Sequence, residues 1–317
     1  MSDKKNIAIT GATGAQGGGL AHAILDDASS EFSVRAITRD VNSDKAKALA
    51  DKGAEVVAGD VNDASSIQSA FEGAYGAFCV TFFWEHFSPE TEMQHAKMMA
   101  DAAKAAGLEH VVWSTLEDTR KWVSLDDDSM PTLNEKYKVP HFDGKGESNA
   151  YFLESGVPVT LLHTSFYWDN LIYFGMGPQK GPDGNLTFNL PMGDKKLPGI
   201  AAEDIGKCAY GVFKGGSKYF GEFVGIAGEH LTGEEMAATL SKVLDHQIGY
   251  FAVPFDMYRG LGFDGAEDLG NMFQVKHDYN EQFCGLRDVG ASKAMNADLL
   301  SFEQWVEKYK EKLQLEA

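Results

Sequence analysis

The sequence predicts an α/β fold, a doubly wound parallel sheet accompanied by a smaller, mostly C-terminal α+β lobe. Short runs rich in β-branched and aromatic residues alternate with helical stretches through the first half of the chain. This alternation is typical of βαβ crossovers that build a parallel sheet covered on both faces. A glycine-rich turn joins the first strand to the first helix. The 317 residues exceed one typical core, so two structural units are expected.

Strands and helices are expected to alternate as far as residue 164. The candidate strands are Asn6–Thr10, Ser33–Arg39, Glu55–Asp60, Tyr75–Thr81, His110–Thr115 and Val157–Thr164. The candidate helices are Ala15–Asp26, Ser43–Lys52, Asp63–Phe71 and Pro89–Ala106. The last helix carries small apolar residues at steps of three and four, which suits close packing on a sheet, and Gly107 ends it.

The pattern changes after residue 115. Leu116–Pro140 is a long polar connection that contains the acidic run Asp126–Asp128, and we expect either a lid over a site or a disordered insertion. Ser165–Pro198 is rich in Gly, Pro, Asn and aromatic residues, which indicates loops and a small separate lobe. Helices are expected again at Ala202–Lys214, at Gly233–Leu244 and from Ser301 to about Leu313. Capping boxes begin the last two.

The turn after the first strand has the glycine pattern G-x-x-G-x-x-G. It places Gly11, Gly14 and Gly17 between a buried strand and an amphipathic helix. Such glycines permit a tight turn and a close backbone approach, while the N–H groups and dipole of the helix start face an anion. We therefore predict a dinucleotide-binding turn, with Thr13 and Gln16 among its cofactor contacts. The alternative is a glycine-rich surface turn.

The end of the second strand distinguishes NAD from NADP. An acidic residue there binds the ribose 2′-hydroxyl, whereas an arginine accommodates a 2′-phosphate. Arg39 occupies this place, and its planar guanidinium can grip phosphate with two parallel hydrogen bonds. Lys45 or Lys47 can add positive charge, and Asp40 opposes it. We predict NADP(H) as the cofactor, the alternative being that Arg39 is an exposed strand-end residue.

Further cofactor contacts are expected where the third and fourth strands end. Asp60 and Val61 are expected beside the adenine, whose exocyclic amine can donate to the Asp60 carboxylate. Thr81 and Phe82 fall beside the topological switch point, where ligands of open α/β sheets bind. Phe82 and Phe83 are equally compatible with core packing, because alternation turns only one of an adjacent pair into the crevice.

Composition and charge exclude several other classes of protein. The net charge of −19, from 47 acidic and 28 basic residues, repels phosphates, so no direct nucleic-acid binding is expected. Hydrophobic residues are 44% and charged residues 24% of the chain, and no apolar segment is long enough to cross a membrane. The polar opening leads straight into a strand, so we expect a cytoplasmic protein. The cysteines and histidines lack ligand spacing, so no metal is expected.

Several strings of the sequence carry a resemblance to a known family. They are Gly11–Gly17, Ala36–Arg39, Gly53–Asp60, Val112–Asp118, His141–Glu147, Pro178–Gly184 and Gly262–Phe273. Through them the chain resembles the NmrA-like family of atypical short-chain dehydrogenase/reductases, close to the animal NmrA-like domain proteins described as NADPH sensors. The resemblance implies a Rossmann domain at residues 1–164, to which segments at about 200–228 return. It also implies that residues 165–317 form mainly a lobe for a substrate or partner.

The same resemblance identifies candidate catalytic residues. Typical short-chain dehydrogenases use an upstream serine and a Tyr-x-x-x-Lys motif, in which the tyrosine protonates the substrate oxygen. The lysine lowers the tyrosine pKa and binds the nicotinamide ribose. Ser114 and Lys145 match the serine and the lysine, but His141 stands at the tyrosine position. The usual proton donor is therefore replaced.

The replacement leaves the catalytic assignment open. The Lys145 ammonium favours a neutral imidazole at His141, which is a poor acid. Lys145 can itself donate a proton, directly or through water, as its counterpart is thought to do in isoflavone-reductase-like relatives. Tyr137 could replace the missing tyrosine only if a continuous helix ran from Tyr137 to Lys145, and Pro140 disfavours such a helix. Each of these residues also has a structural interpretation. His141 can be a hydrogen-bonding residue at a helix start, and Ser114 a strand-end hydroxyl that bonds the backbone. Lys145 can be a ligand of the cofactor ribose with no chemical role.

Two functions follow from these observations. The first is an NADPH-dependent reductase of a small carbonyl, quinone or conjugated substrate, with Phe166, Tyr167 and Trp168 shaping an apolar pocket. The second is a non-catalytic NADP(H) or redox sensor that regulates a protein partner. The preserved serine and lysine favour the reductase, whereas the missing tyrosine favours the sensor. A monomer or a homodimer is expected in either case.

Overall fold

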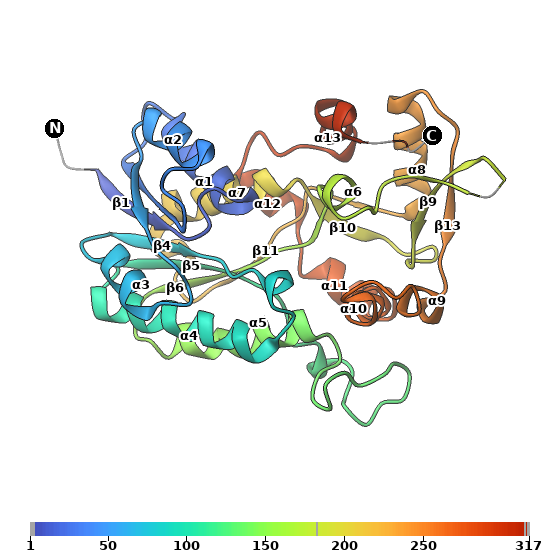
Figure 1. The fold of residues 1–317 in the computed structure, drawn as a ribbon, viewed down its shortest axis with the longest axis horizontal. Helices are drawn as coiled ribbons and strands as arrows, with labels where there is room; N and C mark the ends of the chain where they lie inside the picture. The colour runs from blue at the N-terminus through green and yellow to red at the C-terminus, as the bar shows by residue number, and fades with distance from the viewer. Residues whose placement is uncertain (1–3, 182, 314, 316–317) are drawn as a thin grey trace.

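A parallel sheet forms the middle layer of the part of the molecule that lies at the left of Figure 1. The computed structural model describes residues 4–181, 183–313 and 315. In this part of the chain a seven-stranded sheet runs in the order β11-β6-β5-β4-β1-β2-β3, and each neighbouring pair is parallel. Its strands are β1 (Lys5–Ile9), β2 (Phe32–Thr38), β3 (Glu55–Ala58), β4 (Gly76–Cys79), β5 (His110–Thr115), β6 (Val159–His163) and β11 (Phe223–Gly225). The order reverses between β1 and β4, which creates a topological switch point.

Helices cover both faces of this sheet (Figure 1). On one face lie α1 (Ala15–Leu25), α2 (Asp44–Asp51), α7 (Ala202–Gly215) and α12 (Val289–Met295). On the other face lie α3 (Ala64–Phe71), α4 (Pro89–Ala106) and α5 (Pro140–Leu153). Strand side chains alternate between the two groups: Ile7 and Ile9 pack toward the first, and Ala8 packs toward the second. The predicted doubly wound sheet is confirmed.

Helix α4 shows why local sequence fixes these elements. The Ser88 side chain accepts a hydrogen bond from the Thr91 N–H, and Pro89 occupies the first turn, where a missing N–H costs nothing. Gly107 ends the helix in the left-handed conformation, with φ of 64°. The small residues Ala96 and Ala100 are buried against the sheet. The helix therefore has the bounds that the sequence predicts.

The remaining elements build a smaller lobe beside the sheet (Figure 1). Its strands form two three-stranded sheets, β12-β10-β7 and β13-β9-β8. They are β7 (Phe166–Tyr167), β8 (Gln179–Lys180), β9 (Leu186–Leu190), β10 (Leu197–Ile200), β12 (Glu229–Leu231) and β13 (Ile248–Ala252). Its helices are α6 (Asn170–Tyr173), α8 (Gly233–Leu244), α9 (Phe255–Arg259), α10 (Ala266–Asp278), α11 (Asn280–Gly285) and α13 (Phe302–Tyr309). Short 3₁₀ helices, which are not confined to this lobe, are η1 (Phe83–Glu85), η2 (Thr119–Lys121), η3 (Gly216–Tyr219) and η4 (Lys310–Lys312).

Later segments of the chain cross back to the central sheet. Strand β11 pairs with β6, and α7 packs against α1. Helix α12, which lies much later in the sequence, also packs on α7. The lobe has its own core, in which Trp168 packs on Phe302 and Trp305. Residues of the second half are thus divided between the two cores.

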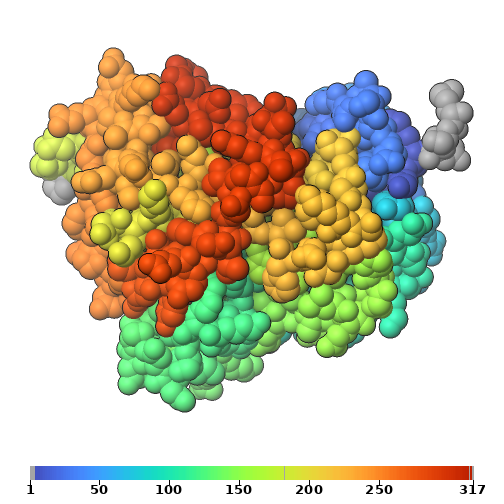
Figure 2. Space-filling view, turned by 180° about the vertical axis from the view of Figure 1, so that it is seen from behind, coloured from blue at the N-terminus to red at the C-terminus, as the bar shows by residue number. Residues whose placement is uncertain are grey.

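The segment Leu116–Pro140 is neither a lid nor a disordered insertion. Its buried apolar side chains, Val123, Met130 and Val139, belong to the core of the lobe. The Asn271 side-chain amide on α10 donates to the carbonyl of residue 131 at 2.9 Å and to that of residue 138 at 2.6 Å. Of its residues only Leu116 lines the large cavity described below. Figure 2 shows the segment in green along the lower edge of the molecule, against the orange and red C-terminal segments. The apolar residues scattered through this polar segment therefore anchor the segment to the lobe.

We expect Gly206→Ala to lower the free energy of unfolding by about 1–3 kcal/mol, the usual cost of overpacking. A Cβ atom at Gly206 would clash with backbone atoms of Gln16 and Leu20, where α7 meets α1. The matched control is Gly285→Ala, since nothing lies within 4 Å of a Cβ there. Urea unfolding measures both. Equal unfolding midpoints for the two variants would contradict close helix contact.

Candidate functional site

A large cavity, about 1220 Å³, opens at the carboxyl ends of the central strands. The glycine turn and the ends of β2 and β4 line one side, and residues of α5, β7, α9 and α10 line the other. The cavity therefore lies at the topological switch point and between the two cores. This is the position where open α/β sheets bind their ligands.

The glycine turn has the geometry of an anion cradle. Gly11 has φ of 61°, a conformation that side chains disfavour, and the N–H of Gly14 donates to the Gly11 carbonyl at 2.8 Å. A Cβ at Gly17 would clash with the Gly11 carbonyl, so the turn can pack against α1 only with glycine there. Gly14 is the N-cap of α1 and supplies no side-chain hydrogen bond. The first N–H groups of α1 are therefore available to an anion, and Thr13 lines the cavity beside them.

Arg39 lies at the rim of the cavity, where the sequence predicts the 2′-phosphate. Its guanidinium forms an ion pair with Glu85 of η1 at 2.5 Å, and its side chain is 62% exposed. Hydrogen bonding to Glu85 and the charge of that carboxylate raise the pKa of Arg39. Ser43 and Lys45 line the same end of the cavity. Glu85 is a rival of any phosphate for Arg39, and the sequence analysis did not identify it.

Only one of the two residues expected near the adenine lines the cavity. Val61 lines the cavity, whereas Asp60 does not belong to its wall. The Asp60 carboxylate accepts hydrogen bonds from the backbone and side-chain nitrogens of Asn62, each at 2.9 Å. These bonds are the main reason that the pKa of Asp60 is lowered. An adenine contact at Asp60 remains a prediction.

The sequence left open whether the aromatic residues after β4 line the crevice or pack in the core, and both roles occur. Phe82 is 57% exposed, whereas Phe83 is buried, and both border the cavity. The Phe83 ring packs edge-on against Trp84, at a centroid distance of 5.3 Å. Phe83 is therefore a packing residue whose inner edge reaches the cavity.

Ser114 connects to the cavity through a neighbour. The Ser114 hydroxyl donates to Gln16 Oε1 at 2.7 Å, and Gln16 Nε2 donates to the Tyr167 hydroxyl at 2.7 Å. Ser114 is buried and is absent from the cavity wall, whereas Gln16 and Tyr167 line it. The hydroxyl holds the Gln16 amide in a fixed orientation. Direct contact of Ser114 with a ligand remains a prediction.

Lys145 lines the cavity and is held by a buried carboxylate. Its Nζ lies 2.8 Å from Glu92 Oε1 and donates to Thr81 Oγ1 at 2.6 Å, and Thr81 donates to the same carboxylate at 2.5 Å. Glu92 is fully buried. Burial alone would raise the pKa of Glu92, but the Lys145 charge, the His86 imidazole 3.4 Å away and hydrogen bonds from Lys145 and Thr81 lower it to about 2. The Glu92 carboxylate is therefore ionised at neutral pH.

Glu92 was missed by sequence reasoning, although the sequence contains a signal for it. It lies on the helix face of Ala96, Met99 and Ala103, which are all buried. A carboxylate within an apolar stripe must find a partner, since an unpaired buried charge is costly. The partner, Lys145, lies on another helix, so local spacing could not identify it.

His141 lines the cavity in the first turn of α5 and is paired with a second buried carboxylate. Its Nδ1 lies 2.6 Å from Asp268 Oδ1, and its backbone N–H donates to Asp268 Oδ2 at 3.1 Å. A carboxylate only accepts, so Nδ1 carries a proton in this contact. The Trp84 ring lies 4.8 Å from the imidazole. Sequence reasoning did not identify Asp268 as the partner of His141, from which it lies 127 positions away.

Tyr137 does not replace the missing tyrosine in this arrangement. Its hydroxyl donates to Glu90 Oε1 at 3.0 Å, and the residue does not line the cavity. Burial and the Glu90 carboxylate raise its pKa above the ordinary value. Pro140 begins α5, so the helix does not extend back to Tyr137.

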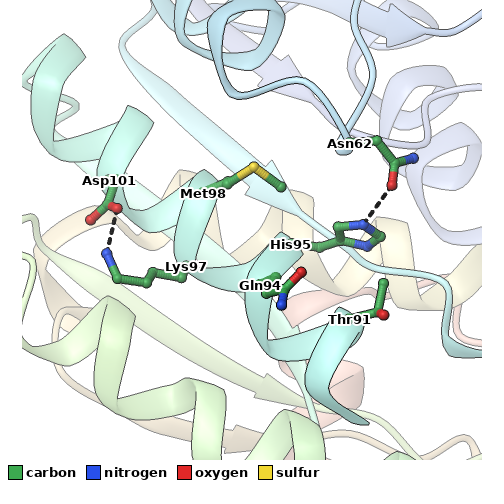
Figure 3. A pocket seen from close by; sticks show the side chains of 7 residues that line it. All are labelled: Asn62, Thr91, Gln94, His95, Lys97, Met98 and Asp101. Atoms are coloured by element: carbon green, nitrogen blue, oxygen red, sulfur yellow. Dashed lines mark hydrogen bonds and ion pairs between the residues drawn. The ribbon is translucent and has the colours of Figure 1, made fainter. Parts of the chain in front are cut away.

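A second, smaller hollow of about 370 Å³ lies on the outer side of α4 (Figure 3). Its residues include Asn62, Met98 and the ion pair of Lys97 with Asp101 at 2.6 Å. His95 borders both hollows and contacts Asn62 Oδ1 at 3.0 Å. None of the predicted site residues lies in its wall.

The described residues contain neither a metal-binding cluster nor a membrane-spanning helix. Across residues 4–181, 183–313 and 315, no group of three or more His, Cys, Asp or Glu side chains is placed to hold a metal ion. No helix in the described part of the chain has the length and apolarity needed to span a membrane. Cys79 and Cys208 are buried as free thiols, and burial raises the pKa of each.

Comparisons with known proteins agree over almost the whole chain. The model of the NmrA-like family matches residues 3–309. The NmrA-like family domain-containing oxidoreductase FrzB of Cladobotryum sp. is 30% identical over 293 residues, covering 84% of this chain and 82% of FrzB.

Solved structures share the fold. NmrA, a negative transcriptional regulator crystallised with NADP, superposes with a TM-score of 0.78 at 23% identity, over 97% of this chain and 95% of that one. QOR2 of Escherichia coli, an NADPH-dependent quinone oxidoreductase, superposes with a TM-score of 0.69 at 22% identity, over 96% of this chain and 99% of that one.

We expect Glu92→Gln to lower the free energy of unfolding by about 3–5 kcal/mol at pH 7, because it leaves the Lys145 ammonium without its counter-charge. The pKa of Glu92 falls from its ordinary 4.5 to about 2 on folding. Its contribution is therefore complete above pH 4.5 and is lost as the pH falls toward 2.

Urea unfolding of both proteins, from pH 7 downward, tests this expectation. The difference in stability between wild type and Glu92→Gln should shrink below pH 4.5. Glu109→Gln, at an exposed position, is the control for loss of one carboxylate. A difference that stays constant as the pH falls would show that Glu92 is not the titrating group.

Proposed function

The chain belongs to the NmrA-like family, and we propose that it binds NADP(H) and reduces a small carbonyl, quinone or conjugated compound. The observation that carries the proposal is the pairing on α5. Lys145 and His141 lie one helical turn apart, line the same cavity as the glycine turn, and are each held by a buried carboxylate. A cofactor-binding turn and two positioned proton-bearing groups then face one space.

The residues present fit NADP(H). The uncapped start of α1 suits the pyrophosphate, and Arg39, Ser43 and Lys45 suit a 2′-phosphate. Glu85 must release Arg39 when the phosphate binds. FrzB is named an oxidoreductase, QOR2 is described as NADPH-dependent, and NmrA has been crystallised with NADP and with NAD, which supports a nicotinamide dinucleotide as the cofactor.

The side chains on α5 have distinct tasks in this proposal. NADPH supplies a hydride when it is bound. Lys145, held in place by Glu92, binds the hydroxyls of the nicotinamide ribose. His141 donates a proton to the substrate oxygen, because Asp268 stabilises the positive imidazole that this task requires. Gln16, fixed by Ser114, orients a polar group of the ligand.

A sensor function is the second candidate, and one observation favours it. The ion pair between Arg39 and Glu85 joins β2 to η1 across the rim of the cavity. A bound 2′-phosphate would break this pair and free η1, beside which Phe82 and Phe87 are exposed. A partner protein that distinguishes the two positions of η1 would then respond to cofactor. NmrA is described as a negative transcriptional regulator.

We expect Arg39→Gln to weaken NADPH binding about 10- to 100-fold, the effect of losing a charged hydrogen bond to phosphate. NADH affinity should not change, since NADH lacks the 2′-phosphate. Glu85→Gln should have the opposite effect and strengthen NADPH binding, because it removes the rival carboxylate. Calorimetric titration measures each affinity, and Lys52→Gln on the far end of α2 is the control. Equal losses of NADPH and NADH affinity in Arg39→Gln would contradict a phosphate site.

We expect His141→Gln to lower kcat at least 100-fold, the usual contribution of a positioned general acid, and to leave the Kd for NADPH within about threefold. NADPH oxidation against a panel of quinones, aldehydes and enones measures the rate. Wild-type turnover on none of these compounds, together with tight NADPH binding, would favour the sensor. Undiminished turnover in His141→Gln would show that another group supplies the proton.

A further inference from the structure

A buried lysine on α10, outside the catalytic arrangement described above, lacks the oxygen partners that lysines normally have. Lys276 is only 3% exposed, yet it borders the large cavity. Among the described residues its Nζ makes one hydrogen bond, to the thioether sulfur of Met272 at 3.2 Å. Burial and the charge of Arg287 lower the pKa of Lys276 to about 7, although the Glu117 carboxylate opposes them.

The surroundings of Lys276 are aromatic. The rings of Phe142, Phe166, Phe273 and Phe283 lie with their centroids 5.3–5.9 Å from Nζ. Ring faces attract a cation, but they do not replace the oxygen acceptors that an ammonium loses when it leaves water. A lysine that were only structural would be cheaper as methionine or leucine at this position.

Other buried cations of the chain are satisfied. Lys145 has Glu92, and Arg287 has Glu117. Lys138 donates to two backbone carbonyls, at 2.6 and 3.0 Å. Among these cations Lys276 therefore lacks an oxygen partner in the described part of the chain, although it borders the cavity, as Lys145 also does.

A second polar group in the same wall is also unsatisfied. Ser165 follows β6, is 6% exposed and lines the cavity. Its hydroxyl has no hydrogen-bond partner among the described residues. Ser165 is adjacent in sequence to Phe166, whose ring is one of those around Lys276. Two buried donors without oxygen acceptors among the described residues thus border one cavity, where ligand oxygens can accept from them.

We infer that Lys276 and Ser165 form an oxygen-binding subsite, and that the substrate is an apolar ring compound that presents a carbonyl oxygen to it. The inference rests on the proposed reductase function and narrows its substrate class to quinones. A quinone has two carbonyl oxygens, so one can bind Lys276 and Ser165 while the other meets His141. The rings of Trp84, Tyr258 and Phe263 in the cavity wall suit the flat, apolar remainder of such a compound.

The test compares two probes of the same shape. Duroquinone carries two carbonyl oxygens, and its methyl groups block addition of cysteine thiols; durene is the same methylated ring without the oxygens. Binding is measured with NADP⁺ present, so that no hydride is available and turnover cannot affect the result. NADP⁺ affinity is measured first, and the binding is repeated without cofactor. Failure to bind NADP⁺ would refute the proposed function, while the two probes still decide the subsite.

We expect Lys276→Met to weaken duroquinone binding about 10- to 100-fold and Ser165→Ala to weaken it about 3- to 10-fold, with durene unaffected. Methionine suits the apolar surroundings, so Lys276→Met should fold with undiminished thermal stability. Lys214→Met is the matched control, because Lys214 also lies over an aromatic ring, that of Tyr210 at 4.3 Å, but does not border the cavity. Equal duroquinone affinity in wild type and Lys276→Met, or no preference of wild type for duroquinone over durene, would overturn the inference.

Discussion

The buried ion pair of Glu92 with Lys145 is the interaction on which the rest of the site depends. A carboxylate with no exposed surface is tolerated only when a cation and further hydrogen bonds replace water, and Lys145 and Thr81 provide them. Because Glu92 is on α4 and Lys145 on α5, the pair fixes the two helices against each other. Separating them would leave two unpaired charges in the interior. The position of α5 over the cavity follows from this constraint.

Helix α5 is held from both sides. Glu92 reaches it from the sheet domain, and Asp268 reaches it from α10 of the lobe. The segment of residues 116–140 reinforces the second contact, since its carbonyls accept hydrogen bonds from Asn271 on the same helix. The lobe and the sheet domain therefore share one helix, and on this helix both Lys145 and His141 have carboxylate partners. Lys276 departs from this pattern, which is why it points to a ligand.

Local sequence was sufficient to predict most of the sheet domain. The bounds of α4 and β5 agree with the periodicity and the helix-ending glycine, and the glycine turn stands where a strand meets a helix. The partners of the site residues could not be predicted in this way. Glu85, Glu92 and Asp268 lie 46, 53 and 127 positions from the residues that they bind. The order of residues 116–140 also depends on distant contacts with α10, so a polar composition was misleading there.

The central claim is that the cavity holds the phosphorylated dinucleotide, and a crystal structure of the protein with NADP⁺ tests it most directly. The account predicts the pyrophosphate against the N–H groups at the start of α1 and the 2′-phosphate on Arg39. Glu85 should have released Arg39, and Lys145 Nζ should lie within hydrogen-bonding distance of the nicotinamide ribose. A cofactor bound elsewhere, or one bound here with the pair of Arg39 and Glu85 intact and its 2′-phosphate in solvent, would contradict the account.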